Sequence, residues 1–189
     1  MFLFIRFKDQ QDQRCGWRAS MQKVEGVDIF ASCILLPASH ESLKNTGGNI
    51  NLLFLDGTSG LVNDPYVNII WIHIVDSNNN SQLVGQLLVN GKSEKHYKLG
   101  LELWKGLILG NGHQDELKDQ IYGIWGDYPT EPPISKLEVT STMTDKEIAM
   151  LNALKSEIGP IHNVLCRFHV LQAINKKVFF DDFLFDFFY

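Results

Sequence analysis

The stretch from Val139 to Lys177, VTSTMTDKEIAMLNALKSEIGPIHNVLCRFHVLQAINKK, decides how the rest of the chain is interpreted. It contains a β-prone run, an acidic residue, an apolar helical pattern, a second apolar run and a Cys-x-x-His pair. Thr144 and Glu147 have the S/T-x-x-E spacing of a capping box, which predicts a helix with Asp145 in its first turn. We therefore expect a strand that ends at an acid and is followed directly by a helix.

Four apolar residues after Asp145 recur at helical spacing and predict one face turned toward a core: Ile148, Leu151, Leu154 and Ile158. The pair Gly159-Pro160 should end this helix, because Gly tolerates left-handed geometry and Pro cannot continue the hydrogen-bond ladder. A carboxylate held where a strand meets a helix is a common way to present an acid to a metal.

The composition is that of a soluble globular protein. The 189 residues are 44% hydrophobic and 21% charged, enough for one domain with a core. The net charge of -5 argues against tight DNA binding by the chain alone, since such binders usually carry a basic stripe. It does not exclude a nuclease core, whose active site is lined by acids.

Cysteine usage and the first residues indicate the compartment. The three cysteines, Cys15, Cys33 and Cys166, are far apart and odd in number, which is typical of a reducing compartment. The start, MFLFIRFK, is interrupted by Arg6 and lacks a cleavage site, so we expect no signal peptide and no membrane span. The expected location is cytoplasmic or nuclear, not secreted.

From residue 50 onward the pattern predicts an α/β fold with a mixed sheet flanked by helices, in which three antiparallel strands precede βα units. Residues 1–49 form a poorly defined N-terminal segment in which Asp28–Pro37 could be a strand or a short helix. The expected elements are strands at Asn51–Asp56, Tyr66–Asp76 and Gln82–Val89, a helix capped by Ser93, a loop at His113–Pro133, a strand at Leu137–Thr142, the helix of the opening stretch, a strand at Asn163–Cys166 and a helix at Phe168–Lys177.

The helix after Ser93 should bury one face, because apolar residues return at helical spacing: Tyr97, Leu101, Trp104 and Ile108. Residues 179–189 form an atypical aromatic tail, rich in Phe and without a basic residue. As a strand, the tail would be an aggregation-prone edge. We expect it to reflect a truncation, an intron read-through or a change of reading frame.

Asp56 and Asp145 are the first candidate site. Each should close a strand in the centre of the sheet, where two carboxylates can share hard cations about 3.5–4 Å apart for phosphoryl transfer. Acids at strand ends are also common as caps and turn formers, and this plainer interpretation stays open.

Cys166 and His169 are the second candidate. One Cys and one His supply at most half of a tetrahedral zinc site, and nothing in the sequence pairs them with His162 or Cys33, so zinc is not expected here. A buried Cys beside a structural His is the plainer interpretation. A Cys–His nucleophilic pair is a further alternative, although no nucleophile elbow accompanies it.

The chain resembles the transposase domain of Mutator-like elements, the MULE transposases, over about Asn51 to Lys177. Four blocks keep the order of that family, and the Cys-x-x-His pair makes the likeness specific: LLFLDGT (Leu52–Thr58), VNGKSEKHYKLGLELW (Val89–Trp104), TSTMTDKEIAMLNALKSEIG and NVLCRFHVLQAINKK.

The resemblance implies an RNase H-like fold and DNA as the substrate. It also implies a triad of two Asp and one Glu that binds Mg²⁺ or Mn²⁺. The two Asp fall on Asp56 and Asp145, and the family's Cys and His fall on Cys166 and His169. Residues 50–178 would then be a partial RNase H-like transposase domain, incomplete at its C-terminus. Other transposase subunits are implied partners, and a nuclear location follows.

The chain departs from the family in several places. The third carboxylate, a Glu, lies well downstream of the Cys-x-x-His helix in complete members, whereas the tail offers only acids that come too early: Asp181, Asp182 and Asp186. Ser59 replaces a usual aromatic, and the first fifty residues show no counterpart of the DNA-binding region. We therefore expect a DDE-type transposase fragment that is inactive alone. The alternative is a non-catalytic interaction module that keeps the fold and uses the aromatic tail and the sheet edge for docking.

Overall fold

A computed structural model describes residues 15–59, 66–76, 78–110, 120–125, 131–145, 147–166 and 170–171. The strands are β1 (Cys15–Val24), β2 (Val27–Leu35), β3 (Asn49–Ser59), β4 (Asn68–Val75), β5 (Ser81–Val89), β6 (Gln120–Trp125), β7 (Glu138–Thr144) and β8 (His162–Leu165). The helices are α1 (Pro37–Thr46), α2 (Glu94–Leu109) and α3 (Ile148–Glu157).

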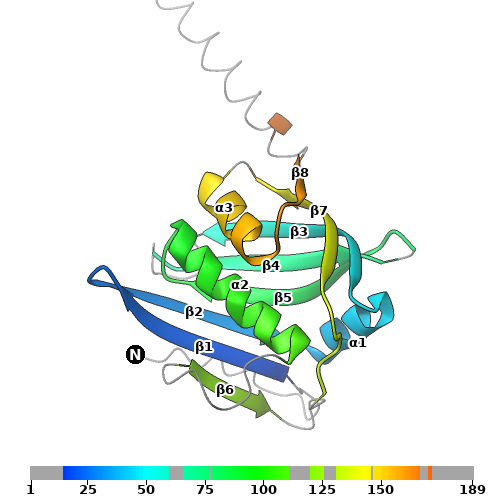
Figure 1. The fold of residues 1–189 in the computed structure, drawn as a ribbon, viewed down its shortest axis with the longest axis horizontal. Helices are drawn as coiled ribbons and strands as arrows, with labels where there is room; N and C mark the ends of the chain where they lie inside the picture. Colours follow the sequence, from blue (N-terminus) through cyan, green and yellow to red (C-terminus); the bar gives the residue numbers. More distant parts are fainter. Residues whose placement is uncertain are drawn as a thin grey trace, which may run out of the picture.

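One mixed sheet joins these strands in the order β6-β1-β2-β5-β4-β3-β7-β8 (Figure 1). The neighbours β3, β4 and β5 are antiparallel, whereas β7 is parallel to β3 and β8 is parallel to β7. The predicted α/β class, with three antiparallel strands before the βα units, is therefore confirmed. Parallel neighbours need crossover connections, and α3 supplies the one between β7 and β8.

The N-terminal part of the chain extends this sheet. β1 and β2 form a hairpin, and β2 pairs with β5, so the sheet continues past the three expected strands. The region predicted to be poorly defined thus contains two strands and α1 from Cys15 onward. The ambiguous run Asp28–Pro37 is mostly strand β2, in which buried and half-buried side chains alternate.

The expected loop at His113–Pro133 also contains a strand. β6 pairs antiparallel with β1 and forms one edge of the sheet. Its partner lies far away in sequence, at the N-terminal end of the described chain. Local composition cannot reveal such a pairing, because strand formation depends on what lies alongside as much as on intrinsic preference.

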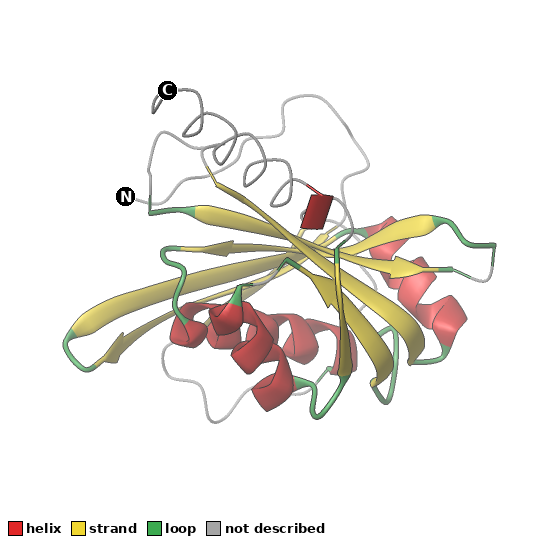
Figure 2. Ribbon diagram, turned by 90° about the horizontal axis from the view of Figure 1, so that it is seen from above, coloured by secondary structure: helices red, strands yellow, loops and turns green. Residues whose placement is uncertain are grey.

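α2 packs across the face of the sheet beside α3 (Figures 1 and 2). The predicted apolar face is confirmed, because Tyr97, Leu101, Trp104 and Ile108 are all buried. Trp104 is fully buried, and its indole N–H donates to the carbonyl oxygen of Val84 at 2.9 Å. The helix ends at Gly110, which adopts the left-handed conformation with φ 67°.

α3 differs from its prediction at its start. The capping box is wrong: the helix begins at Ile148, and neither Thr144 nor Glu147 makes the expected cap bond. Instead, the Thr144 hydroxyl donates to the carbonyl oxygen of Asp145, and a carboxylate oxygen of Asp145 accepts the Glu147 N–H at 3.0 Å. This Asx-type turn delays the helix, since the side chain satisfies the backbone before the first helical turn does.

The buried face of α3 also differs from the prediction. Ile148 is 72% exposed, whereas the residues that are buried are Met150, Ala153 and Leu154. The later start of the helix places Ile148 at its first position, away from the core. Of the predicted face, Leu154 is buried and Ile158 is partly buried against the core.

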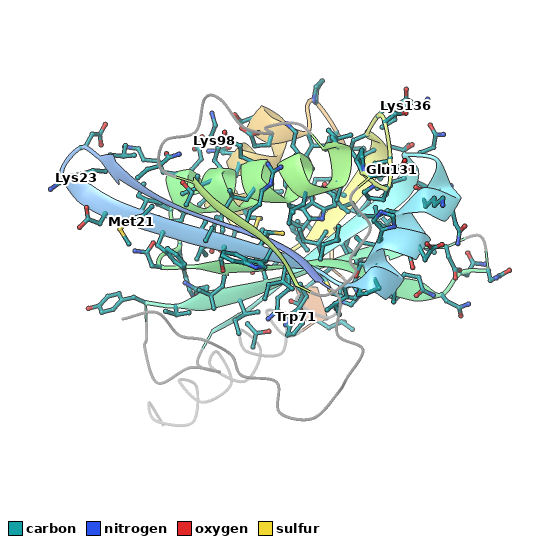
Figure 3. The ribbon with its side chains drawn as sticks, turned by 90° about the horizontal axis from the view of Figure 1, so that it is seen from below. Met21, Lys23, Trp71, Lys98, Glu131 and Lys136 are labelled. Carbon is teal, nitrogen blue, oxygen red and sulfur yellow. The ribbon has the colours of Figure 1, made fainter. Side chains whose placement is uncertain are left out.

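The two faces of β3 separate the core from the site. Leu53 and Leu55 are buried in the core that α2 and α3 cover, while Phe54 and Asp56 alternate with them and face the other way. Trp71 of β4 is paired with Asp56, and Figure 3 shows it on the side of the sheet away from α2 and its Lys98. Asp56 therefore lies on the face opposite the helices.

The end of the opening stretch is described only in part. Val170 and Leu171 are helical, and the Val170 N–H donates to the carbonyl oxygen of Cys166 at 3.1 Å. The remainder of the predicted helix Phe168–Lys177, including His169, lies outside the described residues. So does the tail at 179–189.

Candidate functional site

Asp56 lies within β3, an inner strand that is third from the β8 edge of the sheet. β7, which precedes Asp145, is next to that edge, so the prediction of two central strands is wrong. β3 continues to Ser59, so the prediction that Asp56 closes its strand is wrong. Its side chain is exposed, and β3 has β4 on one side and β7 on the other. A carboxylate on an inner strand that is still open to solvent can accept a ligand without burial of its charge.

Asp145 lies one residue beyond the end of β7, as predicted. The parallel pairing of β3 with β7 places Phe54 opposite Met143, and two residues further along the two strands come Asp56 and Asp145. Parallel strands advance at the same rise, so the two acids lie at the same level of neighbouring strands. The structure thus brings together the backbone positions of both predicted acids.

The two carboxylates have different immediate neighbours. Asp145 is half-buried, and the Glu147 N–H holds one of its oxygens at 3.0 Å. Asp56 lies near His73 of β4, whose Nδ1 is 3.1 Å from the hydroxyl oxygen of Ser81. Burial lowers the pKa of His73, and the negative charge of Asp56 acts in the opposite direction. His73 is a neighbour of the site that the sequence pattern did not single out.

The first turn of α2 adds polar groups beside Asp145. The Tyr97 hydroxyl lies 2.9 Å from each carboxylate oxygen of Glu147, and Glu94 accepts a hydrogen bond from the Asn152 amide of α3 at 3.1 Å. Helical spacing predicted Tyr97 in the core, and the capping-box pattern predicted only a capping role for Glu147. The signal that could have found them is the Ser-Glu-x-x-Tyr start of α2, within a block already used for the family resemblance.

The environment of Tyr97 favours its neutral form. Burial raises the pKa of Tyr97 far above its usual range, and the hydrogen bond to Glu147 raises it further, as do the charges of Glu147 and Asp145. The hydroxyl therefore stays protonated as a donor to the Glu147 carboxylate. Glu147 and Asp145 therefore both lie within electrostatic reach of the Tyr97 hydroxyl.

Cys166 continues the edge of the sheet after β8. Its N–H donates to the carbonyl oxygen of Thr144 at 3.0 Å, and its side chain is half-buried. Cys33 lies in the core on β2, with four strands between β2 and β8 in the sheet order, so these two thiols do not come together. Burial raises the pKa of the Cys33 thiol, which keeps it protonated. The partner of Cys166 in the motif, His169, is outside the described residues.

The donor set at Asp56 and Asp145 suits a hard cation such as Mg²⁺. Magnesium in proteins is usually bound through one or two carboxylates and keeps several waters. Asp56 on β3 and Asp145 just after β7 are carboxylates of this kind. Among the residues that the structure describes, no group of three or more His, Cys, Asp and Glu is placed to hold a metal ion.

No helix in the described ranges is both long enough and apolar enough to cross a membrane. Neither a protein-family model nor a curated protein matches the chain.

Proposed function

We propose that this chain carries an RNase H-like catalytic core related to the MULE transposases, in which Asp56 and Asp145 bind Mg²⁺ or Mn²⁺ for phosphoryl transfer on DNA. The observation that carries the proposal is the parallel register of β3 and β7, which brings these two acids to one level. The family resemblance implies that these two Asp belong to the metal-binding triad.

The topology supports the RNase H-like part of the proposal. In the order β5-β4-β3-β7-β8, three antiparallel strands are followed by two strands parallel to β3, with α2 before β7 and α3 before β8. β1, β2 and β6 are then additions outside β5. These three strands lie on the other side of β5, so they do not pair with β3 or β7, which carry Asp56 and lead to Asp145.

The two carboxylates have separate tasks in this proposal. Asp56 is exposed and supplies an oxygen ligand from an inner strand of the sheet, while Asp145 supplies one from the β7–α3 connection, where the Glu147 N–H orients it. A bound Mg²⁺ would supply charge neutralisation at the phosphate and a lowered pKa for a bound water or 3′-hydroxyl. The resemblance implies a third carboxylate, a Glu, and no described residue fills that place.

Binding of Mn²⁺, followed by electron paramagnetic resonance titration, tests this site directly. We expect the wild-type chain to bind Mn²⁺, and Asp56→Asn and Asp145→Asn each to weaken binding by more than about tenfold, because each removes a charged ligand. Asp76→Asn is the matched control, since Asp76 is also an acid after a strand, but its carboxylate accepts hydrogen bonds from the β4–β5 turn and from the Gln82 side chain of β5. Equal binding by all four proteins would overturn the proposal.

Catalysis by the chain alone is not expected, because two of the three implied carboxylates do not complete the site. In a nicking assay on supercoiled DNA with Mg²⁺ or Mn²⁺, we expect no product above background. Robust nicking that Asp145→Ala abolishes would show that the site is complete and would contradict this expectation.

The second candidate function is a non-catalytic interaction module, and the exposed end of the sheet favours it. β8 is a parallel edge strand on which neighbouring side chains point to opposite faces, yet Val164 is 37% exposed and Leu165 is 47% exposed. Parallel strands are usually covered on both faces. Sedimentation across a range of concentrations tests this role: association that Val164→Asn and Leu165→Asn abolish would favour it, and a monomer at all concentrations would count against it.

A further inference from the structure

Tyr97, Glu147 and Asp145 form a continuous hydrogen-bonded path from α2 to the candidate metal site. Tyr97 projects from the first turns of α2 and is almost fully buried, at 2% exposure. Glu147 and Asp145 belong to the connection between β7 and α3. The path therefore joins two elements that are distant in sequence and that meet beside Asp145.

The first link is between side chains. The Tyr97 hydroxyl donates to the Glu147 carboxylate, whose two oxygens are both 2.9 Å away. A hydrogen bond from a buried donor to a charged acceptor is stronger than one between neutral groups. The Glu147 side chain is thus held in one place by a hydroxyl that stays protonated.

The second link is between backbone and side chain. The N–H of the same residue, Glu147, donates to a carboxylate oxygen of Asp145 at 3.0 Å. Glu147 therefore holds Tyr97 with its side chain and Asp145 with its backbone. The Glu147 carbonyl oxygen also accepts the Leu151 N–H of α3 at 3.1 Å, so the Tyr97 bond is the anchor that comes from outside the β7–α3 segment.

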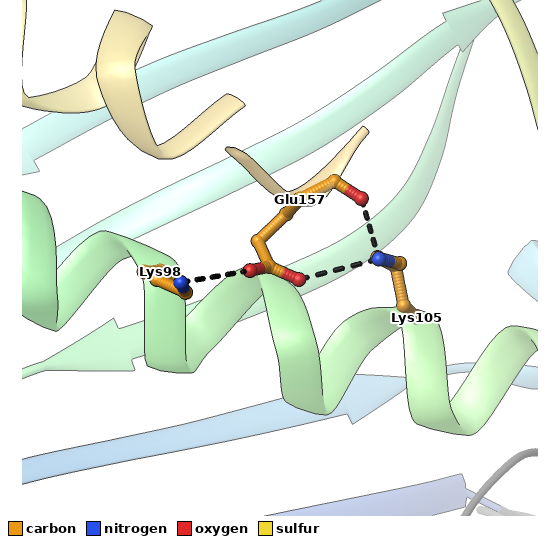
Figure 4. Close-up of polar contacts among 3 residues, drawn as sticks. All are labelled: Lys98, Lys105 and Glu157. Atoms are coloured by element: carbon orange, nitrogen blue, oxygen red, sulfur yellow. Dashed lines mark hydrogen bonds and ion pairs between the residues drawn. The ribbon is translucent and has the colours of Figure 1, made fainter. Parts of the chain in front are cut away.

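The helix behind this path is anchored at several points. Trp104 holds α2 in the core, Glu94 accepts a hydrogen bond from Asn152 of α3, and Lys98 and Lys105 reach Glu157 at the end of α3 (Figure 4). Tyr97 thus presents its hydroxyl from a fixed helix to a short connection that has no side-chain cap of its own.

We propose that Tyr97 is a positioning residue, which acts through Glu147 to hold the Asp145 carboxylate in the orientation that binds the metal. This inference rests on the proposed function, in which Asp145 is a ligand. Partners behind the ligands of a metal commonly fix ligand orientation, and their removal weakens metal binding although they never touch the metal.

Tyr97→Phe tests the inference, because it removes the hydroxyl and keeps the buried ring. Hydrogen exchange of the Glu147 amide reports on its bond to Asp145 without any metal. We expect exchange to rise about fivefold to tenfold, as for the loss of one hydrogen-bond anchor. Mn²⁺ binding should weaken on the order of tenfold.

Glu157→Gln is the matched control. It weakens a different connection between α2 and α3, that of Glu157 with Lys98 and Lys105, and leaves the Tyr97 path intact. We expect unchanged exchange at the Glu147 amide and unchanged Mn²⁺ binding. If the control changed both measurements as much as Tyr97→Phe does, the effect would be a general loosening of helix packing and the inference would be overturned.

Glu147→Ala gives a second route to the same answer. It removes the carboxylate but keeps the N–H that donates to Asp145, so it should raise exchange at position 147 as Tyr97→Phe does. Both changes break the same path, so the double variant should show the same rise in amide exchange and the same loss of Mn²⁺ binding as either single variant. Additive effects would contradict the inference.

Failure of the inference and failure of the proposed function are distinguishable. If the wild-type chain binds no Mn²⁺, the proposed function falls, while the exchange measurement still decides whether Tyr97 holds Asp145. If the wild-type chain binds Mn²⁺ and Tyr97→Phe changes neither exchange nor binding, the proposed function stands and the positioning role of Tyr97 is overturned.

Discussion

The two halves of α2 differ in how they are held. In the C-terminal half, Trp104 and Ile108 are fully buried against the sheet, and shape and apolar area hold the helix there. In the N-terminal half, Tyr97 and Glu94 reach polar partners at the β7–α3 connection and on α3. Both halves pack against the sheet, and the N-terminal half adds directed hydrogen bonds to the β7–α3 connection and to α3.

Because of this difference, substitutions in α2 can be chosen to affect either the stability of the fold or the candidate site. Loss of a large buried side chain removes apolar contacts and leaves a cavity, so it weakens the whole fold. Loss of one hydroxyl at the polar half removes a single hydrogen bond, whose net contribution to stability is about 1 kcal/mol. Loss of a hydrogen bond from the N-terminal half of α2 should therefore change the orientation of the Asp145 carboxylate while the fold stays intact.

Trp104→Ala is expected to have the largest effect. It removes the central aromatic of the packed half and leaves the Val84 carbonyl without its indole donor. The free energy of unfolding should fall by about 3–5 kcal/mol, measured by urea denaturation. A loss no larger than that of Tyr97→Phe would erase the difference between the two halves.

Gly85→Ala tests the packing of Trp104 from the sheet side. A methyl group at Gly85 would lie 2.7 Å from two atoms of the Trp104 ring, which is too close for any carbon contact. We expect a loss of about 1–3 kcal/mol from overpacking, seen as a lower urea midpoint. Gly57→Ala is the control, because a methyl group there meets nothing within 4 Å.

Glu157→Gln should have a smaller effect, which depends on salt. It removes the charge that Lys98 and Lys105 share across the α2–α3 contact, where the lysines are partly exposed. The expected loss is about 1 kcal/mol or less. It should shrink between about 0.05 and 0.5 M NaCl, because the Debye length falls roughly threefold over that range. A loss that did not depend on salt would point to packing at this contact instead.

The pH dependence of His96 is expected to be the smallest effect. His96 lies in the first turn of α2, and burial lowers its pKa below the usual value near 6.5. The unfolded chain therefore binds the proton more readily, so the stability that neutral His96 contributes is present above about pH 6.5 and is lost as the pH falls below it. Urea midpoints measured at neutral and mildly acidic pH should differ less in His96→Gln than in the wild type, and an equal difference would contradict the assignment.

The sequence predicted the central elements well, because their signals are local. β3, β4, β5 and α2 have continuous apolar runs or helical periodicity, and each run was bounded by turn residues. The buried face of α2, from Tyr97 to Ile108, follows directly from that spacing. Asp145 was likewise predicted at the end of its strand.

Other parts depended on distant partners or on competing local bonds. β6 becomes a strand by pairing with β1. Its β-branched and aromatic run QIYGIW lies inside a segment whose polar flanks predicted a loop. The capping box at Thr144 failed because the Asp145 side chain accepted the Glu147 N–H first, while Glu147 turned to Tyr97. Sequence spacing shows which bonds are possible, and tertiary contacts decide between them.

The sequence by itself determined the α/β class, the amphipathic helix α2 and the choice of Asp56 and Asp145 as candidate site residues. Periodicity and residue chemistry are properties of short segments, so they can be read without the fold. Only the tertiary structure decided that Asp56 and Asp145 lie at one level, since that depends on the register of β3 against β7. It also brought Tyr97 to Glu147, because hydrogen bonds between residues fifty positions apart require the helix and the β7–α3 connection to pack together.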